Sequence, residues 1–311
     1  MPRAALLLGY LFLGLSLYYI ASKYMTSADR GECEKYVLTE SVGRVLVGAM
    51  ISRGAYSLVM EGTIVATSAS VAIKIGMEPR AGLDTDHVLL SSLNGSDYFP
   101  FYYGHGTTSC TKKTGRAVEY PYVVMERLGR PLADIPDIVA DRSQRLALAV
   151  SAAQDVLGGL EKLHDMGMLL HDIYPYNVLA AGDSIEGRFK LIDFGEAIPL
   201  REGWGAYNAI NHIYTTLRED RREPISQRDD LERVVYLILA TVDGRLPWDV
   251  EAGDADFRRS LKADLNVSDA CTGFPVQIAQ VLEHARNGLA YGEAIPFPKI
   301  KALLQAAIPA H

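Results

Sequence analysis

Residues 170–177 read Leu-His-Asp-Ile-Tyr-Pro-Tyr-Asn, and residues 191–195 read Leu-Ile-Asp-Phe-Gly. The first stretch places Asp172 and Asn177 five residues apart, a spacing at which one loop can direct a carboxylate towards a hydroxyl group and an amide oxygen towards Mg²⁺. The second places Asp193 at the end of an apolar run, where its carboxylate can hold a hard cation. Upstream, the strand-like run Val-Ala-Ile-Lys ends at Lys74, which can pair with nucleotide phosphates. These four groups, in this order, predict a phosphoryl-transfer site.

The composition is that of a folded globular protein. The 311 residues are 49% hydrophobic and 22% charged, so the chain can bury a substantial core. The net charge of −7 and the absence of a polybasic run argue against nucleic acid as a partner. Three cysteines, Cys33, Cys110 and Cys271, are too few for a disulfide framework or a zinc site and allow at most one bridge.

The N-terminal run of residues 4–22 carries no charge. At about 1.5 Å per residue in a helix, it is long enough to cross most of a bilayer core. We therefore expect an N-terminal hydrophobic helix, with residues 1–30 as a signal anchor or a signal peptide. An anchor predicts a single-pass membrane protein of the secretory pathway, with the membrane as a partner, and a cleaved peptide predicts a secreted protein. A buried core helix is the third alternative.

The rest of the chain changes from a strand-rich to a helix-rich pattern. Short β-branched runs between Gly-containing turns predict a small antiparallel sheet. The expected strands are residues 41–47, 56–61, 63–66 and 70–75. Apolar residues at intervals of three and four predict helices over residues 143–166, after Asp229, and over residues 276–287. The pattern predicts an α+β chain with a sheet-rich N-terminal lobe and a larger helical C-terminal lobe.

Three further motifs carry a family resemblance. They are Tyr-Val-Val-Met-Glu-Arg-Leu-Gly at residues 122–129, Ser-Gln-Arg-Asp-Asp-Leu-Glu at 226–232 and Gly-Arg-Leu-Pro-Trp at 244–248. With the motifs above, they resemble the protein kinases, and specifically the casein kinase 1 group, which includes the vaccinia-related and tau-tubulin kinases. The similarity covers about residues 38–306. It implies a two-lobed protein-kinase-like fold, with the N-lobe at 38–126 and the C-lobe at 127–306.

The resemblance also implies a role for each candidate residue. Asp172 would be the catalytic base, Asn177 and Asp193 the magnesium ligands, and Lys74 the clamp on the ATP phosphates. Asp230 would hold the catalytic loop from below, although a helix N-cap is an alternative role for it. Nucleotide contacts are expected from Gly54, Ala72, Lys74, the gatekeeper Met125, and the backbone of Glu126 and Leu128.

Four positions depart from the pattern of the group. Residues 52–57, Ser-Arg-Gly-Ala-Tyr-Ser, keep only the middle glycine of the glycine-rich loop. The glutamate that would pair with Lys74 falls on Asp86, which is one methylene shorter. His171 stands where an arginine usually precedes the base and would be a poorer partner for a phosphorylated loop. Tyr174 replaces a lysine, and a neutral phenol cannot neutralise the charge that develops on the γ-phosphate.

These features leave three functions open. The first is a Ser/Thr protein kinase that uses ATP and Mg²⁺ to phosphorylate protein hydroxyl groups. The second is a membrane-associated pseudokinase that binds nucleotide without efficient transfer, and the third is a small-molecule phosphotransferase. The intact lysine, base and metal ligands favour the first, whereas Tyr174 and the degenerate glycine loop favour the second.

One segment bears on the choice of substrate. Residues 214–222 carry Arg218, Arg221 and Arg222, and the resemblance places this segment beside the substrate groove. Guanidinium groups bind carboxylate and phosphate oxygens, so the expected partner is a protein substrate with acidic or already phosphorylated residues near its target hydroxyl. The alternative is a solvated loop that is partly neutralised by neighbouring acidic residues.

Overall fold

The computed structural model describes residues 32–77, 83–111, 114–200, 213–250 and 255–308. The chain divides into two compact units. The sheet unit comprises Met1–Asn94 and Phe101–Arg127, and the helical unit comprises Gly95–Pro100 and Leu128–His311. The expected α+β organisation, strand-rich first and helical afterwards, is confirmed for the described residues.

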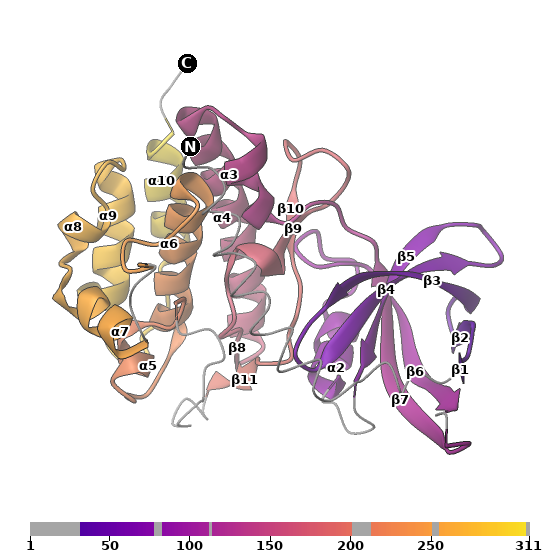
Figure 1. Ribbon diagram of the computed structural model, residues 1–311. Coiled ribbons are helices and arrows are strands. Elements are labelled where there is room, and N and C mark those ends of the chain that lie inside the picture. The colour runs from indigo at the N-terminus through magenta and orange to yellow at the C-terminus, as the bar shows by residue number, and fades with distance from the viewer. Residues whose placement is uncertain (1–31, 78–82, 112–113, 201–212, 251–254, 309–311) are drawn as a thin grey trace, which may run out of the picture. The chain divides into compact units, whose positions relative to one another are not determined.

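The described part of the sheet unit is a seven-stranded antiparallel sheet with the helix α2 (Asp84–Ser92) packed against strand β6 (Figure 1). The strand order is β1-β6-β7-β5-β4-β3-β2. The strands are β1 (Glu32–Cys33), β2 (Tyr36–Thr39), β3 (Gly43–Arg53), β4 (Ser57–Ile64), β5 (Ser70–Gly76), β6 (Tyr102–Thr111) and β7 (Ala117–Glu126).

Alternation along the strands gives the sheet its buried face. Val37 lies opposite Val45 in the β2–β3 pair, and Ile73 lies opposite Val124 in the β5–β7 pair. All four side chains are buried in one apolar cluster, and each contributes roughly 1.5–3 kcal/mol of transfer free energy. Because successive side chains of a strand point to opposite faces, Lys74 leaves β5 on the other side from Ile73.

The two strands expected at residues 56–61 and 63–66 form one strand, β4. Gly62 does not make a turn: it lies opposite Val71 in the β4–β5 pair. A Cβ atom at Gly62 would lie 2.8 Å from the side chains of Val71 and Ile73. The glycine permits close packing over the strand, so the prediction of two separate strands is wrong.

The helical unit contains the long helices and two small antiparallel pairs, β8–β11 and β9–β10. Its described strands are β8 (Met168–Leu169), β9 (Val178–Ala180), β10 (Phe189–Leu191) and β11 (Ile198–Pro199). Its helices are α3 (Ile135–Ile138), α4 (Arg142–Asp165), α5 (Leu217–Asp220), α6 (Gln227–Asp243), α7 (Ala255–Asp264), α8 (Val267–Ala270), α9 (Val276–Glu283) and α10 (Phe297–Ala306), with the short turns η1 (Leu132–Asp134), η2 (Pro175–Asn177) and η4 (His284–Gly288).

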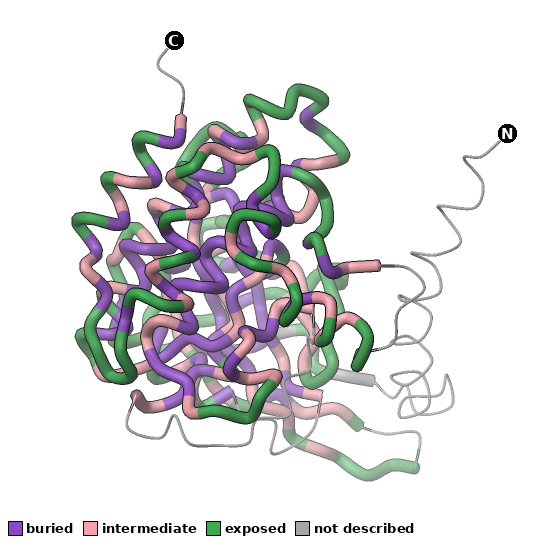
Figure 2. Tube along the Cα trace, turned by 90° about the vertical axis from the view of Figure 1, so that its left-hand side faces the viewer, coloured by how far each residue is buried: buried purple, intermediate pink, exposed green. Residues whose placement is uncertain are grey.

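Helix α6 is the centre of this unit. Every residue from Asp229 to Val242 is buried, and Figure 2 shows the buried segments gathered in the interior behind exposed outer turns. Helices α4 and α9 both pack against α6, and α10 packs against α4 and α9. The expected helices at 143–166 and after Asp229 are confirmed as α4 and α6. The third, expected at 276–287, is α-helical only to Glu283 and continues as the π-helical turn η4.

Local capping fixes both ends of α6. Ser226 is its N-cap, and the backbone N–H of Ser226 donates to Asp229 Oδ2 at 2.8 Å. Gly244 ends the helix with a left-handed φ of 75°, which glycine adopts without a steric cost. Asp230 is therefore not the N-cap, and its carboxylate is available for another role.

The disulfide bonding of the cysteines agrees with the prediction from the sequence. Cys110 on β6 is disulfide-bonded, and Cys33 lies opposite it in the β1–β6 register. Cys271 is a free, buried thiol, and burial raises its pKa to about 11. The expectation of at most one bridge is confirmed.

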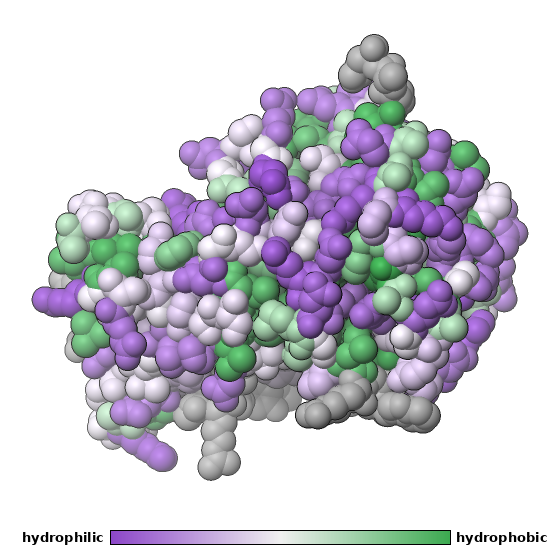
Figure 3. Space-filling model, turned by 180° about the vertical axis from the view of Figure 1, so that it is seen from behind, coloured by the Kyte–Doolittle hydropathy of each residue, from purple (hydrophilic) through white to green (hydrophobic). Residues whose placement is uncertain are grey.

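The prediction of a membrane protein is corrected by the structure. No described helix is long and apolar enough to cross a bilayer, and the face seen in Figure 3 carries hydrophilic residues among the apolar ones. The expected N-terminal helix, whether anchor, signal peptide or core helix, lies in residues 1–30, outside the described residues. The expectation used only the length and hydropathy of that run, whereas a spanning segment must also satisfy its own backbone groups as a helix.

Helix α4 contains a glycine that tests the packing of the helical unit. A Cβ atom at Gly158 would lie 2.3 Å from the ring of Tyr98. We expect Gly158→Ala to lower the free energy of unfolding by about 1–3 kcal/mol, although alanine favours helix, because the overpacked ring must move. Urea denaturation measures this. Gly182→Ala is the control, since nothing lies within 4 Å of its added Cβ; equal effects of the two substitutions would contradict the packing argument.

Candidate active site

The candidate residues fall in both units. Lys74, Gly54, Ala72, Met125 and Glu126 belong to the sheet unit. The helical unit contains Leu128, Asp172, Asn177 and Asp193. Each half of the candidate site is described below within its own unit.

In the sheet unit, Lys74 on β5 forms a buried ion pair with Asp86 on α2. The Lys74 Nζ atom lies 2.7 Å from Asp86 Oδ2, and the two residues are only 6% and 1% exposed. The shorter aspartate therefore reaches the lysine, and the expected pairing is confirmed. The pair fixes the direction of the lysine head group, because a buried charge is stable only beside a counter-ion.

Backbone hydrogen bonds hold the loop at Gly54 and the strand β7, which is expected to contact adenine. Gly54 N–H donates to the carbonyl of Ser57 at 2.8 Å and closes the β3–β4 hairpin. Met125 and Ala72 lie opposite one another in the β7–β5 pair and are both buried. The end of β7 is fixed to the start of β6, since Glu126 N–H donates to the carbonyl of Phe101 at 2.8 Å.

In the helical unit, the loop between β8 and β9 brings Asp172 and Asn177 together. Asn177 Nδ2 donates to Asp172 Oδ2 at 2.9 Å and to the Asp172 carbonyl at 3.0 Å. The turn η2 makes this possible, because Asn177 N–H donates to the Tyr174 carbonyl at 2.9 Å and curls the loop back on itself. With its Nδ2 directed at Asp172, the amide turns its Oδ1 atom away from Asp172.

Asp193 follows β10 in the same unit. Its φ is +64°, an uncommon backbone conformation for a residue other than glycine, and that of His171 is +69°. The backbone beside Asp193 is held by Ile192 N–H, which donates to the Asn177 carbonyl at 3.0 Å. Such conformations concentrate at functional sites, where the surrounding structure maintains them.

Burial and neighbouring carboxylates raise the pKa values of Asp172 and Tyr174. Burial raises the pKa of Asp172 to about 6, and the neighbouring Asp193 carboxylate adds to the effect, although Arg233, Asn177 and His171 oppose it. Burial also raises the pKa of Tyr174, as do Asp172 and Asp193. The Tyr174 phenol is therefore neutral at any pH at which a protein is stable.

The donor atoms fit a magnesium ion. Mg²⁺ prefers hard oxygen ligands and usually takes one or two from protein together with substrate phosphates. The Asp193 carboxylate and the Asn177 Oδ1 atom are such ligands. Phosphate oxygens of a substrate and water would complete the coordination of a cation held by these two residues.

Asp230 holds the loop as expected. Its carboxylate accepts hydrogen bonds from the backbone N–H groups of Leu170 and His171, both at 3.0 Å. The Nε2 atom of His164 on α4 lies 2.9 Å from Asp230 Oδ2, the oxygen that also accepts from Leu170. Burial alone would raise the pKa of Asp230, but His164 and Arg233 outweigh it and hold that pKa below its usual range.

Two residues that the sequence did not single out complete the surroundings of the base. Glu219 on α5 and Arg233 on α6 form a buried ion pair, and Glu219 also contacts His171. Signals for both exist in the sequence: Thr216 and Glu219 have the spacing of a capping box, and Arg233 is a charge inside an apolar helix. Neither signal names the partner, because the two residues are 14 positions apart.

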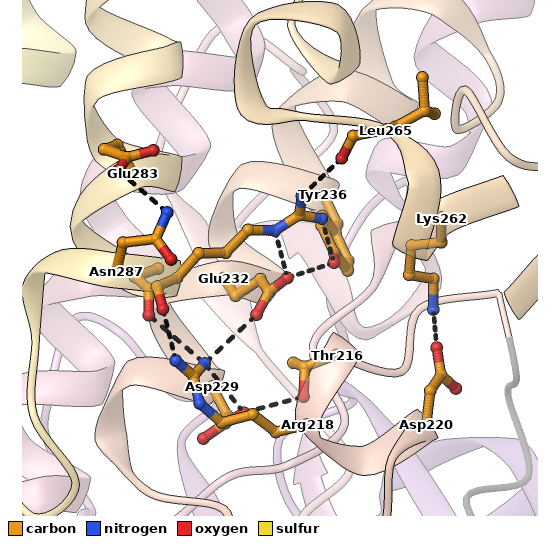
Figure 4. A network of polar contacts seen from close by, with 12 residues as sticks. Thr216, Arg218, Asp220, Asp229, Glu232, Tyr236, Lys262, Leu265, Glu283 and Asn287 are labelled. Atoms are coloured by element: carbon orange, nitrogen blue, oxygen red, sulfur yellow. Dashed lines mark hydrogen bonds and ion pairs between the residues drawn. The ribbon is translucent and has the colours of Figure 1, made fainter. Parts of the chain in front are cut away.

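The arginines of residues 214–222 do not share one surface. Arg218 is 9% exposed, and its guanidinium donates to the carbonyls of Ala285 and Arg286 at 3.4 and 2.6 Å (Figure 4). Asp229 and Glu232 each lie 3.8 Å from it. The expectation that Arg218 faces a substrate is therefore wrong. Arg221 and Arg222 are exposed.

Comparisons with known proteins extend these observations. No family model matches the sequence. A probable serine/threonine-protein kinase of Dictyostelium discoideum is 25% identical over 258 residues, which cover 79% of this chain and 50% of that protein. Casein kinase I homolog 1 of Saccharomyces cerevisiae is 27% identical over 289 residues, which cover 84% of this chain and 50% of the homolog. The chain thus spans about half the length of these relatives.

A shorter relative and a solved structure agree with them. A probable casein kinase I homolog of Encephalitozoon cuniculi is 26% identical over 265 residues, covering 78% of this chain and 75% of that protein. The structure of vaccinia-related kinase 3 matches with a TM-score of 0.69 over 94% of both chains, at 17% identity. This likeness shows the protein kinase fold. In sequence the chain is similar to casein kinase I homologs, at modest identity over most of its length.

The Lys74–Asp86 ion pair can be tested through the stability of the protein. Asp86→Asn should lower the free energy of unfolding by about 3–5 kcal/mol, because the buried ammonium group loses its carboxylate partner. Thermal or urea unfolding of the purified protein measures the change. The control is Asp84→Asn, on an exposed residue in the first turn of the same helix. A loss no greater than that of the control would show that Asp86 is not the counter-ion.

Proposed function

We propose that the chain is a Ser/Thr protein kinase that transfers the γ-phosphate of ATP to protein hydroxyl groups in the presence of Mg²⁺. The catalytic domain in this proposal is residues 38–306, with an N-lobe at 38–126 and a C-lobe at 127–306. The observation that supports it best is the 2.9 Å contact between Asp172 Oδ2 and Asn177 Nδ2 in a loop of the same unit in which Asp193 follows β10.

Asp172 is the proposed base. One of its oxygens, Oδ2, receives the Asn177 amide hydrogen, which leaves Oδ1 to orient the acceptor hydroxyl and take its proton. A pKa of about 6 keeps this carboxylate ionised at neutral pH and makes it more basic than an ordinary aspartate. In this proposal the loop orients the hydroxyl for attack on the γ-phosphate.

Asn177 and Asp193 are the proposed magnesium ligands. When bound, Mg²⁺ would neutralise charge on the nucleotide phosphates and hold them in a fixed geometry. The protein contributes the oxygen atoms and holds them in place. Asp172 orients the Asn177 amide, and the hydrogen bond from Ile192 N–H to the Asn177 carbonyl holds the backbone beside Asp193.

The sheet unit would bind the nucleotide. In this proposal Lys74, directed by Asp86, holds the ATP phosphates, and Gly54 allows the β3–β4 hairpin to approach them. Ala72 and Met125 would line the adenine pocket, with the backbone of Glu126 and Leu128 as hydrogen-bonding partners for the ring. These contacts are those of the family, assigned residue by residue.

Tyr174 should make the enzyme slow. A phenol can donate one hydrogen bond, but it cannot carry the positive charge that a lysine would bring to the transferring phosphoryl group. Its ring lies 6.0 Å from that of Tyr176 and 5.7 Å from that of Tyr214, in an aromatic cluster within the helical unit. A preference for acidic or phosphorylated substrates, if present, rests on Arg221 and Arg222, since Arg218 is engaged elsewhere.

Two substitutions separate the proposed roles. Asp172→Asn should lower kcat by 100-fold or more while leaving the affinity for Mg-ATP nearly unchanged, because only the handling of the hydroxyl proton is lost (~10²–10⁴-fold). Asp193→Ala should weaken the binding of Mg-ATP itself, because a direct ligand of the metal is removed. Phosphate transfer from labelled ATP to casein, with nucleotide binding measured by calorimetry, checks both.

The same measurements distinguish the alternatives. A protein that binds nucleotide but shows no Asp172-dependent phosphate transfer would be a pseudokinase. Transfer to small hydroxyl compounds in preference to casein would identify a small-molecule phosphotransferase. Equal loss of nucleotide binding in Asp172→Asn and Asp193→Ala would contradict the assignment of the two carboxylates.

The raised pKa of Asp172 predicts the acid limb of the activity. A base works only when it is ionised, so kcat should fall as the pH decreases through about 6, where this carboxylate takes up a proton. The binding of Mg-ATP, measured at the same pH values, serves as the control for loss of structure. An acid limb centred near pH 4, the ordinary range for an aspartate, would show that Asp172 is not the titrating base.

A further inference from the structure

Four buried polar side chains, those of His171, Glu219, Arg233 and Asp230, form a closed ring of contacts next to the proposed base Asp172. His171 Nε2 is 2.6 Å from Glu219 Oε1, and Arg233 contacts the other oxygen of Glu219. Arg233 Nη1 is 3.9 Å from Asp230 Oδ1, which accepts the backbone N–H of His171 at 3.0 Å. The ring therefore runs from the catalytic loop through α5 to α6 and back, and all four side chains are less than 10% exposed.

Glu219 is the acidic member that belongs to neither the loop nor α6. Burial on its own would raise the pKa of Glu219, but Arg233 and His171 outweigh it and bring that pKa down to about 2. The carboxylate is therefore an anion at every pH at which the protein would work. The backbone N–H of Thr216 also donates to it, at 2.6 Å, so its position is fixed by α5 itself.

The ring acts on Asp172 in two ways. His171 is the residue before Asp172, and its φ of +69° sets the direction in which the chain presents the aspartate. A conformation of this kind persists only where neighbours impose it, and here Asp230 holds the backbone of His171 while Glu219 holds its side chain. The charges of Arg233 and His171 also oppose the rise in the pKa of Asp172.

We propose that Glu219 is a positioning residue whose buried carboxylate holds His171, and through it Asp172, in the arrangement that transfer requires. This inference rests on the proposed function. Many kinases bring a negative charge to the residue before the base by phosphorylating a loop. In this chain the carboxylate of α5 supplies that charge permanently, and an imidazole receives it in place of the usual guanidinium.

The first variant removes the charge and keeps the shape. Glu219→Gln should lower kcat by roughly 10- to 100-fold, the effect of a displaced catalytic group, with little change in the KM for ATP. Glu223→Gln is the matched control, since Glu223 follows the same helix and is exposed. A folded Glu219→Gln protein with the kcat of the control would overturn the proposal.

A second pair of variants keeps the Glu219–Arg233 pair intact, because Arg233 without its partner could prevent folding. His171→Arg places a guanidinium beside Glu219, and His171→Gln leaves a neutral donor there.

His171→Gln should lower kcat by roughly 10- to 100-fold with little change in the KM for ATP, because it removes the side chain that Glu219 holds. His171→Arg gives Glu219 a cation to hold and should keep kcat within a few-fold of the parent. A folded His171→Gln protein with the kcat of the parent would overturn the proposal, and so would an equal loss of kcat in His171→Gln and His171→Arg.

A readout without nucleotide separates this inference from the proposed function. The N–H groups of Leu170 and His171 donate to Asp230, and they should exchange with deuterium at least 10-fold faster in Glu219→Gln or His171→Gln than in Glu223→Gln. Unchanged exchange would overturn the inference. Faster exchange in a chain that shows no transfer dependent on Asp172 would support it while ruling out the kinase function.

Discussion

The carboxylate of Asp230 is the point on which the helical unit depends. It is buried in α6 and receives two backbone N–H groups of the catalytic loop and the ring of His164 from α4. A buried carboxylate without partners would cost several kcal/mol, and three donors turn that cost into a geometric constraint. The loop can therefore occupy only the path that satisfies Asp230, and the conformation that directs Asp172 follows from it.

The departures from the family pattern differ in their consequences. Aspartate in place of glutamate at position 86 changes little, because α2 brings the shorter side chain to 2.7 Å from Lys74. Histidine at position 171 is compensated by Glu219, which lies at 2.6 Å. Tyrosine at position 174 differs from these two, because burial and then the Asp172 and Asp193 carboxylates raise the pKa of its phenol and keep it neutral. Of these three departures, Tyr174 is therefore the one expected to weaken transfer.

Much of the fold and part of the site could be read from the sequence, because both are encoded locally. The periodicity of α4 and α6, and the partners Asp86 and Asp230, follow from spacing along a helix or from motif order. Gly62 was misjudged, since a glycine that permits close packing looks like a glycine that makes a turn. The roles of Lys74, Asp172, Asn177 and Asp193 stay predictions until transfer is measured.

The contacts that the sequence did not predict join residues that are far apart along the chain. Arg218 resembles a surface residue because its sequence neighbours are charged, but its partners are carbonyls at residues 285 and 286, almost 70 positions away. The pairing of Glu219 with Arg233 and His171 likewise joins three separate elements. Sequence spacing carries no information about such contacts. They depend on how α5, α6 and the turn η4 come together in three dimensions.

Several basic side chains of the helical unit form buried ion pairs with acidic residues of α5 and α6. Lys262 pairs with Asp220 at 2.8 Å, Arg233 pairs with Glu219, and Arg286 pairs with Glu232 at 2.8 Å (Figure 4 shows the first and part of the Arg218 network). Each pair is largely buried and involves α5 or α6. Lys262 and Arg233 thus fix the short helix α5, which carries the carboxylate that faces His171. Among the three arginines of residues 214–222, Arg218 is used internally in the same way, and the exposed Arg221 and Arg222 are the two that can respond to the charge of a substrate.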